Sequence, residues 1–129
     1  MDIVIDFDGT CVTHDYPSIG REIGATPVLR ELTDAGHRLI LSTIRSNEKR
    51  KNNHTLDDAV EWFKDRDIPL FGIQVHPEQQ SWNSSPKVYG DLYIDDAALG
   101  CPLIIPATEE RPFVDWKTVR KLLEERGII

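Results

Sequence analysis

The chain of 129 residues has the length of a single domain, residues 1–129, and its 40% hydrophobic and 29% charged residues are ordinary for a globular protein. Its formal net charge of −7 argues against a general affinity for nucleic acids or anionic membranes. No apolar stretch is long enough to span a bilayer, and no segment resembles a signal peptide. We therefore expect a cytoplasmic protein with no membrane partner.

A short apolar strand at the start of the chain ends in two carboxylates. Ile3, Val4 and Ile5 form a run without polar alternation, which is typical of a strand buried on both faces of a parallel sheet. Asp6 and Asp8 follow this run two residues apart, so both carboxylates lie on one side if the strand geometry continues. Ligands of parallel sheets bind beyond such carboxyl ends.

Two anions this close need neutralisation, and a hard divalent cation with oxygen ligands is the usual solution. Gly9 allows the backbone to turn sharply and to present N–H groups to an anion, and Thr10 adds a hydroxyl. The alternative interpretation is a simple tight turn, because Asp-Gly pairs are common turn formers.

The rest of the chain alternates helical and strand patterns. Residues 11–24 have few apolar side chains and predict a loop or flap directly after the acidic segment. The later predicted elements are a helix from Thr26 and Pro27 to Gly36, a strand over 38–43, a polar segment over 44–54, a helix over 55–65, strands over 71–75, 92–94 and 103–105, and a helix over 115–126.

This alternation predicts a doubly wound, Rossmann-like α/β fold. We expect about five parallel strands with helices on both faces of the sheet. The carboxyl ends of these strands would meet at one edge, where polar side chains gather. Besides the first strand, the second ends in Ser42 and Thr43, and the fourth is followed by Asp95 and Asp96.

Each of these polar pairs has a simpler explanation. Adjacent side chains of a strand point to opposite faces, so only one of Ser42 and Thr43 can face a ligand, and both are also ordinary strand-ending residues. Asp95 and Asp96 side by side are also turn formers. The 4 histidines share no spacing typical of a metal site, so zinc is not expected.

Taken in order, four motifs resemble those of the haloacid dehalogenase-like (HAD) phosphohydrolase superfamily. The resemblance extends over residues 1 to about 105. The first and last motifs are specific, whereas the hydroxyl and the lysine are individually weak. The motifs are Asp6-Phe7-Asp8-Gly9-Thr10, Ser42-Thr43, Lys87 and Asp95-Asp96.

The resemblance implies a Mg²⁺-dependent phosphatase that hydrolyses phosphomonoesters through an aspartyl-phosphate intermediate. Asp6 would be the nucleophile, and Asp8 would protonate the leaving alcohol and then activate water. Mg²⁺ would be bound by a carboxylate oxygen of Asp6, the backbone carbonyl of Asp8, and a carboxylate of Asp95 or Asp96.

The same resemblance assigns roles around the phosphoryl group. Thr43 is the preferred hydroxyl, because Thr43-Ile44-Arg45 resembles the Thr-x-Arg form of the superfamily, and Ser42 is the alternative. Lys87 would neutralise phosphate charge, although it lies closer to Asp95 in sequence than is usual and a solvated loop lysine is the alternative. The predicted substrate-binding residues are Gly9, Thr10, Ser42 and Arg45.

A basic cluster follows the second predicted strand and contains Arg45, Lys49, Arg50 and Lys51. It is either a basic rim that attracts a phosphorylated substrate or a solvated loop, and Arg45 is the better candidate for substrate contact.

Neither long gap between the motifs has room for a cap domain. By resemblance, capless members act on large substrates or as homo-oligomers whose neighbours cover the site. The resemblance implies that the substrate is a phosphorylated small molecule or macromolecular end. The alternatives are a phosphotransferase of the same superfamily and a non-catalytic HAD-like binding or scaffold protein. A phosphorylation-switch receiver domain is disfavoured, because the third predicted strand ends in Val75-His76-Pro77 rather than in an acceptor carboxylate.

Overall fold

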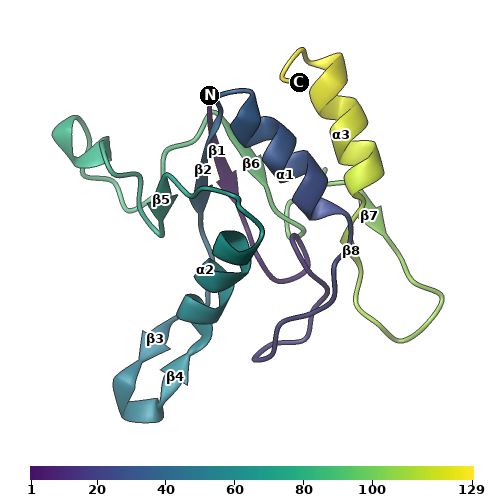
Figure 1. Cartoon of the computed structure of the whole chain (residues 1–129), viewed down its shortest axis with the longest axis horizontal. Coiled ribbons are helices and arrows are strands. Elements are labelled where there is room, and N and C mark those ends of the chain that lie inside the picture. Colours follow the sequence, from purple (N-terminus) through teal and green to yellow (C-terminus); the bar gives the residue numbers. More distant parts are fainter.

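The computed structural model describes residues 1–129, and its centre is a four-stranded parallel sheet (Figure 1). In the spatial order β5-β2-β1-β6, its strands are β5 (Gly72–Ile73), β2 (Arg38–Leu41), β1 (Asp2–Ile5) and β6 (Leu92–Ile94). β1 pairs with β2 on one side and β6 on the other, so Ile5 lies beside both Leu41 and Ile94. The carboxyl ends of these three strands therefore meet at one edge of the sheet.

Apolar runs in the sequence explain the two central strands. All four residues of β1 are buried, and Leu39, Ile40 and Leu41 of β2 are completely buried. Residues buried on both faces are expected for the inner strands of a parallel sheet. β5 is shorter than the predicted strand over 71–75, because Gln74 has a φ of 66° and leaves the extended conformation.

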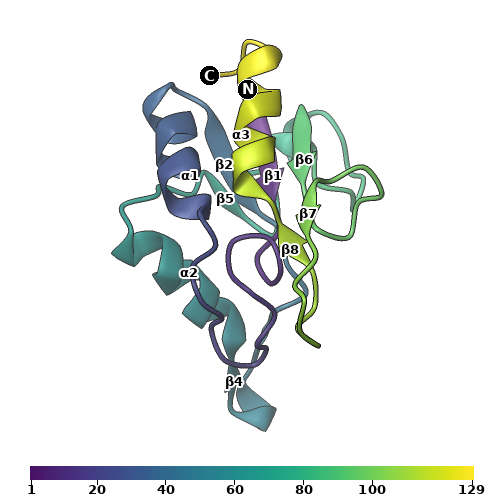
Figure 2. The ribbon, with the colours of Figure 1, turned by 90° about the vertical axis from the view of Figure 1, so that its right-hand side faces the viewer.

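The three helices pack against one face of the sheet (Figure 2). Residues Ile3, Ile5, Leu39 and Leu41 share a single hydrophobic core with the buried side chains of all three helices. Because side chains alternate along a strand, Val4 must point to the opposite face. The helices are α1 (Ala25–Asp34), α2 (Thr55–Asp65) and α3 (Trp116–Glu125).

Local sequence signals explain the start of α3 but not that of α1. Asp115 caps α3, because its side chain accepts a hydrogen bond from the backbone N–H of Thr118. The start of α1 differs from the prediction: the helix begins at Ala25 after Gly24, whose φ is 100°, and Thr26 is not its cap. The hydroxyl of Thr26 donates instead to Glu22.

A loop segment over 74–91, and not a helix, covers the second face of the sheet (Figure 2). Its only regular element is the 3₁₀ turn η2 (Gln79–Ser81). The backbone at Gly90 approaches the side chain of Val4 so closely that a Cβ there would lie 2.5 Å from it. The α/β class is therefore confirmed, whereas helices on both faces of the sheet are not found.

The predicted fifth parallel strand is wrong. Leu103 and Ile104 form β7 (Leu103–Ile104), which pairs antiparallel with β8 (Phe113–Val114) in a separate two-stranded sheet. The apolar run after Pro102 is thus used in a hairpin that forms its own sheet, and the main sheet has four strands. A short apolar run does not by itself reveal which partner strand it will pair with.

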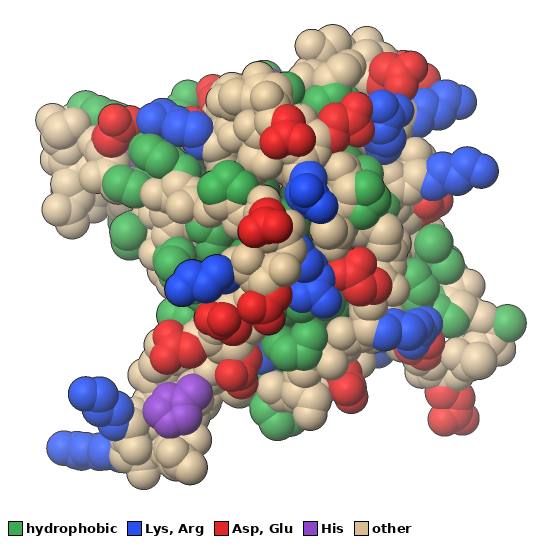
Figure 3. All heavy atoms as spheres, in the orientation of Figure 1, with side chains coloured by type: hydrophobic (Ala, Val, Ile, Leu, Met, Phe, Trp, Pro, Cys, Tyr) green, Lys and Arg blue, Asp and Glu red, His purple; other side chains and the backbone are tan.

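The polar segment 44–54 forms a second small hairpin at the carboxyl edge of the main sheet. It consists of β3 (Asn47–Glu48), the 3₁₀ turn η1 (Lys49–Lys51) and β4 (Asn53–His54). The cationic and histidine side chains at its end project from the body of the molecule (Figure 3). The hairpin leads directly into α2, as Figure 1 shows.

None of the helices combines the length and the apolar character that crossing a bilayer demands.

Candidate active site

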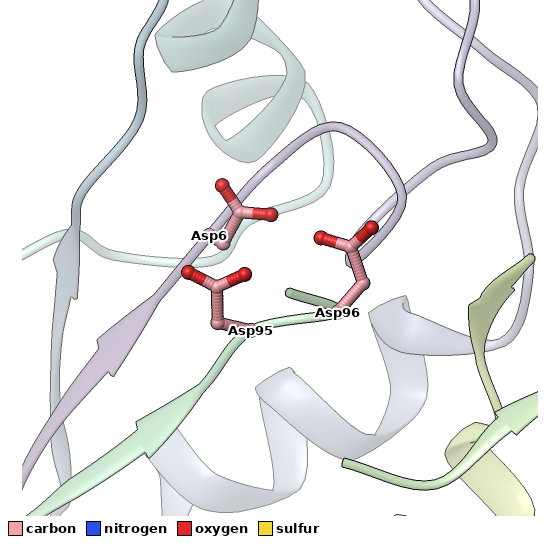
Figure 4. Close-up of side chains that lie close together, drawn as sticks. All are labelled: Asp6, Asp95 and Asp96. Atoms are coloured by element: carbon pink, nitrogen blue, oxygen red, sulfur yellow. The ribbon is translucent and has the colours of Figure 1, made fainter. Parts of the chain in front are cut away.

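Three carboxylates meet beyond the neighbouring strands β1 and β6. Asp6 follows β1, and Asp95 and Asp96 follow β6, whose last residue lies beside Ile5. One carboxylate oxygen of each aspartate lies within 4.8 Å of the others. Figure 4 shows the three side chains directed toward a common space. The parallel register thus brings together residues that are almost ninety positions apart in the chain.

The ionised form of the Asp6 carboxyl group is disfavoured in this cluster. Burial raises its pKa to about 8, and the neighbouring negative charges of Asp95 and Asp96 act in the same direction. The hydrogen bond from Thr10 opposes the shift, because it favours the ionised form. At neutral pH this cluster is therefore stabilised by a bound proton or cation.

The donor set of the cluster fits Mg²⁺. The ion prefers oxygen ligands and usually binds through one or two carboxylates, with other oxygens completing the coordination. Besides the three carboxylates, the backbone carbonyl of Asp8 accepts no hydrogen bond in the structure and is free to act as a ligand. Ligation of the metal by this carbonyl stays a prediction from the resemblance.

Thr10 connects the two strands that bear the carboxylates. Its buried hydroxyl donates to Oδ2 of Asp6 at 2.7 Å and accepts from the backbone N–H of Asp96 at 3.0 Å. Its carbonyl accepts a hydrogen bond of 2.7 Å from the indole of Trp116 at the start of α3. The predicted substrate contact of this hydroxyl is thus not found, because its donor and acceptor functions are occupied within the protein.

Gly9 makes the sharp turn that the sequence predicts, with a φ of 80°. Its N–H donates to the carbonyl of Val12 at 2.8 Å, so this group is not presented to an anion, and the predicted role in substrate binding is wrong on this point. A Cβ at this position would overlap Nε2 of His14 and lie 2.5 Å from Oδ2 of Asp96. The site therefore requires glycine for space as well as for conformation.

His14 is a site residue that the sequence did not reveal. It lies on the flap, and its Nε2 is 2.8 Å from Oδ2 of Asp96. Both side chains are mostly buried, with relative exposures of 15% and 14%. The residues are 82 positions apart, and a single histidine in a polar loop offers no periodicity or ligand spacing that would indicate this contact.

The carboxylate of Asp8 is not one of the three in the acidic cluster and pairs with Arg45. Nε and Nη2 of Arg45 donate to the two carboxylate oxygens of Asp8, each at 2.8 Å. The side chain of Arg45 is completely buried. The prediction of Arg45 as part of an open basic rim is therefore wrong: Lys49, Arg50 and Lys51 are exposed, but Arg45 is enclosed.

Ser42 and Thr43 follow β2, which ends at Leu41 and not at Thr43 as predicted, and the N–H of Ser42 donates to the carbonyl of Ile5 at 2.9 Å. The Thr43 hydroxyl accepts from the backbone N–H of Arg45 at 3.1 Å. Gln74 holds the backbone of Thr43, since its side-chain oxygen accepts from the N–H and its nitrogen donates to the carbonyl. The Ser42 hydroxyl makes no hydrogen bond within the protein. Gln74 is thus a second supporting residue that sequence reasoning missed.

Lys87 is not brought into contact with the acidic cluster. It precedes β6, and its Nζ lies 5.7 Å from the ring centroid of Tyr93, on the sheet face that the loop segment covers. It forms no ion pair with any carboxylate. Two other basic side chains lie at the site: Arg45 pairs with Asp8, and His14 contacts Asp96.

No family model matches the chain, and no curated protein matches it. A solved structure, described as that of a conserved protein coded by a locus from Bacteroides thetaiotaomicron, is 34% identical to the chain with a TM-score of 0.76. The similarity covers 98% of this chain and 91% of that one. At this identity and coverage, the chain belongs to the same family as the conserved Bacteroides thetaiotaomicron protein.

Proposed function

We propose that the protein is a Mg²⁺-dependent phosphatase of the HAD-like superfamily, which hydrolyses phosphomonoesters through an aspartyl-phosphate. The observation that carries the proposal is the convergence of Asp6, Asp95 and Asp96 beyond two adjacent parallel strands. The order of the motifs supports it, because the first and last motifs of the resemblance lie beside one another in space. The assignment to this superfamily rests on motifs and geometry and not on the related structure.

Asp6 is the nucleophile in this proposal. Its Oδ2 accepts the hydrogen bond from Thr10, which leaves Oδ1 to attack phosphorus. The bond from Oδ1 to phosphorus forms as the bond from phosphorus to the leaving oxygen breaks, and Asp8 gives a proton to that oxygen. Water then attacks the aspartyl-phosphate, Asp8 takes its proton, and inorganic phosphate leaves with Asp6 restored.

A bound Mg²⁺ would be held by Asp6, by the carbonyl of Asp8 and by Asp95 or Asp96, and would reduce the repulsion between the nucleophile and the phosphate. Thr10 would fix the orientation of Asp6 for this role, because its hydroxyl is hydrogen-bonded both to Asp6 and to the backbone N–H of Asp96. The hydroxyl of Ser42 or Thr43 donates to a phosphoryl oxygen. The Thr43 oxygen accepts from the backbone N–H of Arg45, and the O–H groups of both residues make no hydrogen bond within the protein, so either can donate.

The role of Lys87 as a phosphate-neutralising residue stays a prediction from the resemblance. In the structure its ammonium group lies over Tyr93 and contacts no carboxylate of the site. A Lys87→Met variant tests this role. If Lys87 is catalytic, its loss should lower kcat/KM by about 100-fold, and if it is an ordinary loop lysine, kcat/KM should not change.

The proposed activity is tested by hydrolysis of 4-nitrophenyl phosphate with Mg²⁺, with a chelator, and with Asp6→Asn. We expect activity that disappears on chelation and falls at least ~10³-fold in Asp6→Asn. Asp34→Asn is a matched control, because Asp34 is an exposed aspartate at the end of α1. A protein that binds Mg²⁺ but hydrolyses no phosphomonoester would overturn the proposal and support a non-catalytic binding protein.

A further inference from the structure

We propose that Arg45 is a positioning residue that holds Asp8 in place for proton transfer and ties the flap, residues 11–24, to it. This inference rests on the proposed function for the proton transfer, but its structural part stands separately. Arg45 lies just beyond β2, whereas its partners come from the loop after β1, from the flap and from the start of α2. One side chain thus joins four segments of the chain.

The contact between Arg45 and Asp8 fixes the plane of the carboxylate. Two nitrogens of the guanidinium donate to the two carboxylate oxygens in parallel, both at 2.8 Å. This bidentate arrangement sets orientation as well as distance. Each carboxylate oxygen has a second lone pair, which remains available for a leaving group or a water molecule.

The other N–H groups of Arg45 hold backbone carbonyls. Nη2 donates to Ser18 at 2.6 Å, and Nη1 donates to Pro17 at 3.2 Å and to Thr55 at 3.3 Å. A guanidinium has five N–H donors, so every donor of Arg45 has a partner within the protein. Pro17 and Ser18 belong to the flap, and therefore the flap and Asp8 are held by the same side chain.

Two aromatic side chains lie close to the guanidinium. Its carbon lies 5.1 Å from the ring centroid of Phe7 and 5.3 Å from that of Tyr16. Phe7 is completely buried in the core, whereas Tyr16 is an exposed residue of the flap. The pair therefore fixes Arg45 against the core and places one flap residue over it.

These contacts imply that Arg45 acts through Asp8 and not on the substrate. A fully buried guanidinium with five satisfied donors gains nothing by turning toward a phosphate, and turning would remove its hydrogen bonds to three backbone carbonyls. Lysine keeps the charge but lacks the planar fork, so Arg45→Lys removes the positioning with little change in charge. Arg45→Lys is therefore the informative variant.

The first experiment compares substrates whose leaving groups differ in their need for a proton. kcat/KM reports the transfer of the phosphoryl group to Asp6. We expect Arg45→Lys to lower kcat/KM by about 100-fold for glycerol 2-phosphate and by less than about 10-fold for 4-nitrophenyl phosphate. Arg120→Lys is the matched control: Arg120 also makes a bidentate pair, with Glu31, but between α1 and α3. It should change neither value.

A double-mutant cycle separates positioning from a general structural role. If Arg45 acts through Asp8, Asp8→Asn combined with Arg45→Lys should be no slower on glycerol 2-phosphate than Asp8→Asn alone. Losses that add, or equal losses on both substrates, would overturn the inference.

The second experiment needs no activity and measures hydrogen exchange of the flap amides. Arg45→Lys and Asp8→Asn should each speed exchange over residues 16–20 by at least about tenfold, whereas Arg120→Lys should not. If Arg45→Lys fails to fold, Asp8→Asn alone makes the measurement. Unchanged exchange in a folded variant would refute the link to the flap. A wild-type protein inert toward both esters would refute the proposed function and not this link.

Discussion

Gly9 lies directly beneath the imidazole of His14, and a single added Cβ would overlap Nε2 of that ring. The φ of 80° at Gly9 adds a conformational penalty for any other residue. We expect Gly9→Ala to lower the free energy of unfolding by about 3 kcal/mol and to weaken Mg²⁺ binding, because the displaced His14 and Asp96 both border the cluster.

Gly36→Ala is the matched control for this substitution. Gly36 has a similar φ of 93°, but a Cβ there would meet nothing within 4 Å. Its cost should be only about 1 kcal/mol, measured by denaturant unfolding, with no effect on Mg²⁺ affinity. Equal losses in the two variants would show that conformation, and not the contact with His14, makes glycine necessary at position 9.

The raised pKa of Asp6 predicts a pH-dependent stability in the metal-free protein. Its folded pKa of about 8 lies above the ordinary value of 3.8, so the folded state holds the proton more tightly than the unfolded chain. Stability should therefore fall as pH rises from about 4 to 8. Asp6→Asn should remove this slope and be more stable than the wild type by on the order of 3 kcal/mol at pH 8.

Thermal unfolding at several pH values in the presence of a chelator measures this effect. The comparison with Asp34→Asn shows whether a lost negative charge alone explains it. Parallel pH profiles for the wild type and Asp6→Asn would contradict the strained environment that we assign to Asp6.

Mg²⁺ affinity should distinguish carboxylate ligands from a carbonyl ligand. We expect both Asp95→Ala and Asp96→Ala to weaken Mg²⁺ binding, measured by titration calorimetry. The larger of the two losses in affinity should be at least about tenfold. Asp8→Ala should change the affinity by less than about threefold, because its proposed ligand is a backbone oxygen, while it slows both proton-transfer steps. A loss in Asp8→Ala as large as in the aspartate pair would contradict this assignment.

Asp2 predicts a loss of stability in acid. Its carboxylate accepts a bidentate pair from Arg38 and a bond from His76, and these partners hold its pKa below 3.8. The stabilisation is fully present above the unfolded pKa and is lost as pH falls through the folded one. Asp2→Asn should cost about 1 kcal/mol at pH 7 and flatten the acid limb of the stability profile.

Glu78→Gln is the control for Asp2, because Glu78 also pairs with Arg38 but is exposed. This substitution should change the free energy of unfolding, measured by chemical denaturation at pH 7, by no more than about 0.5 kcal/mol. If Glu78→Gln lowered the free energy of unfolding more than Asp2→Asn, the exposed pair of Arg38 with Glu78, and not the pair with Asp2, would be the stabilising one.

The strands that build the acidic cluster could be predicted from local sequence. Buried apolar runs that end in carboxylates indicate parallel strands, and the carboxyl ends of such strands lie at one edge. That was enough to bring Asp6 together with Asp95 and Asp96. The prediction did not depend on knowing how the helices pack.

The flap contacts could not be predicted in this way. Asp8 is 37 residues from Arg45 and His14 is 82 residues from Asp96, and neither pair has a repeating pattern that links its members. Arg45 was recognised by its position after β2, but an arginine in a polar segment looks exposed until the backbone carbonyls around it are known. The prediction of five strands in the main sheet was wrong for the same reason. The apolar run at Leu103 and Ile104 fits a separate hairpin as well as a strand of the main sheet.

The hydrogen bond from Trp116 to the carbonyl of Thr10 makes the last helix a support of the acidic loop. A ribosome that has made all four motifs has therefore not yet supplied the residue that fixes the first one. A shortened chain ending before Trp116 would retain every carboxylate of the cluster, yet the turn that aligns Asp6 would have lost its buried anchor.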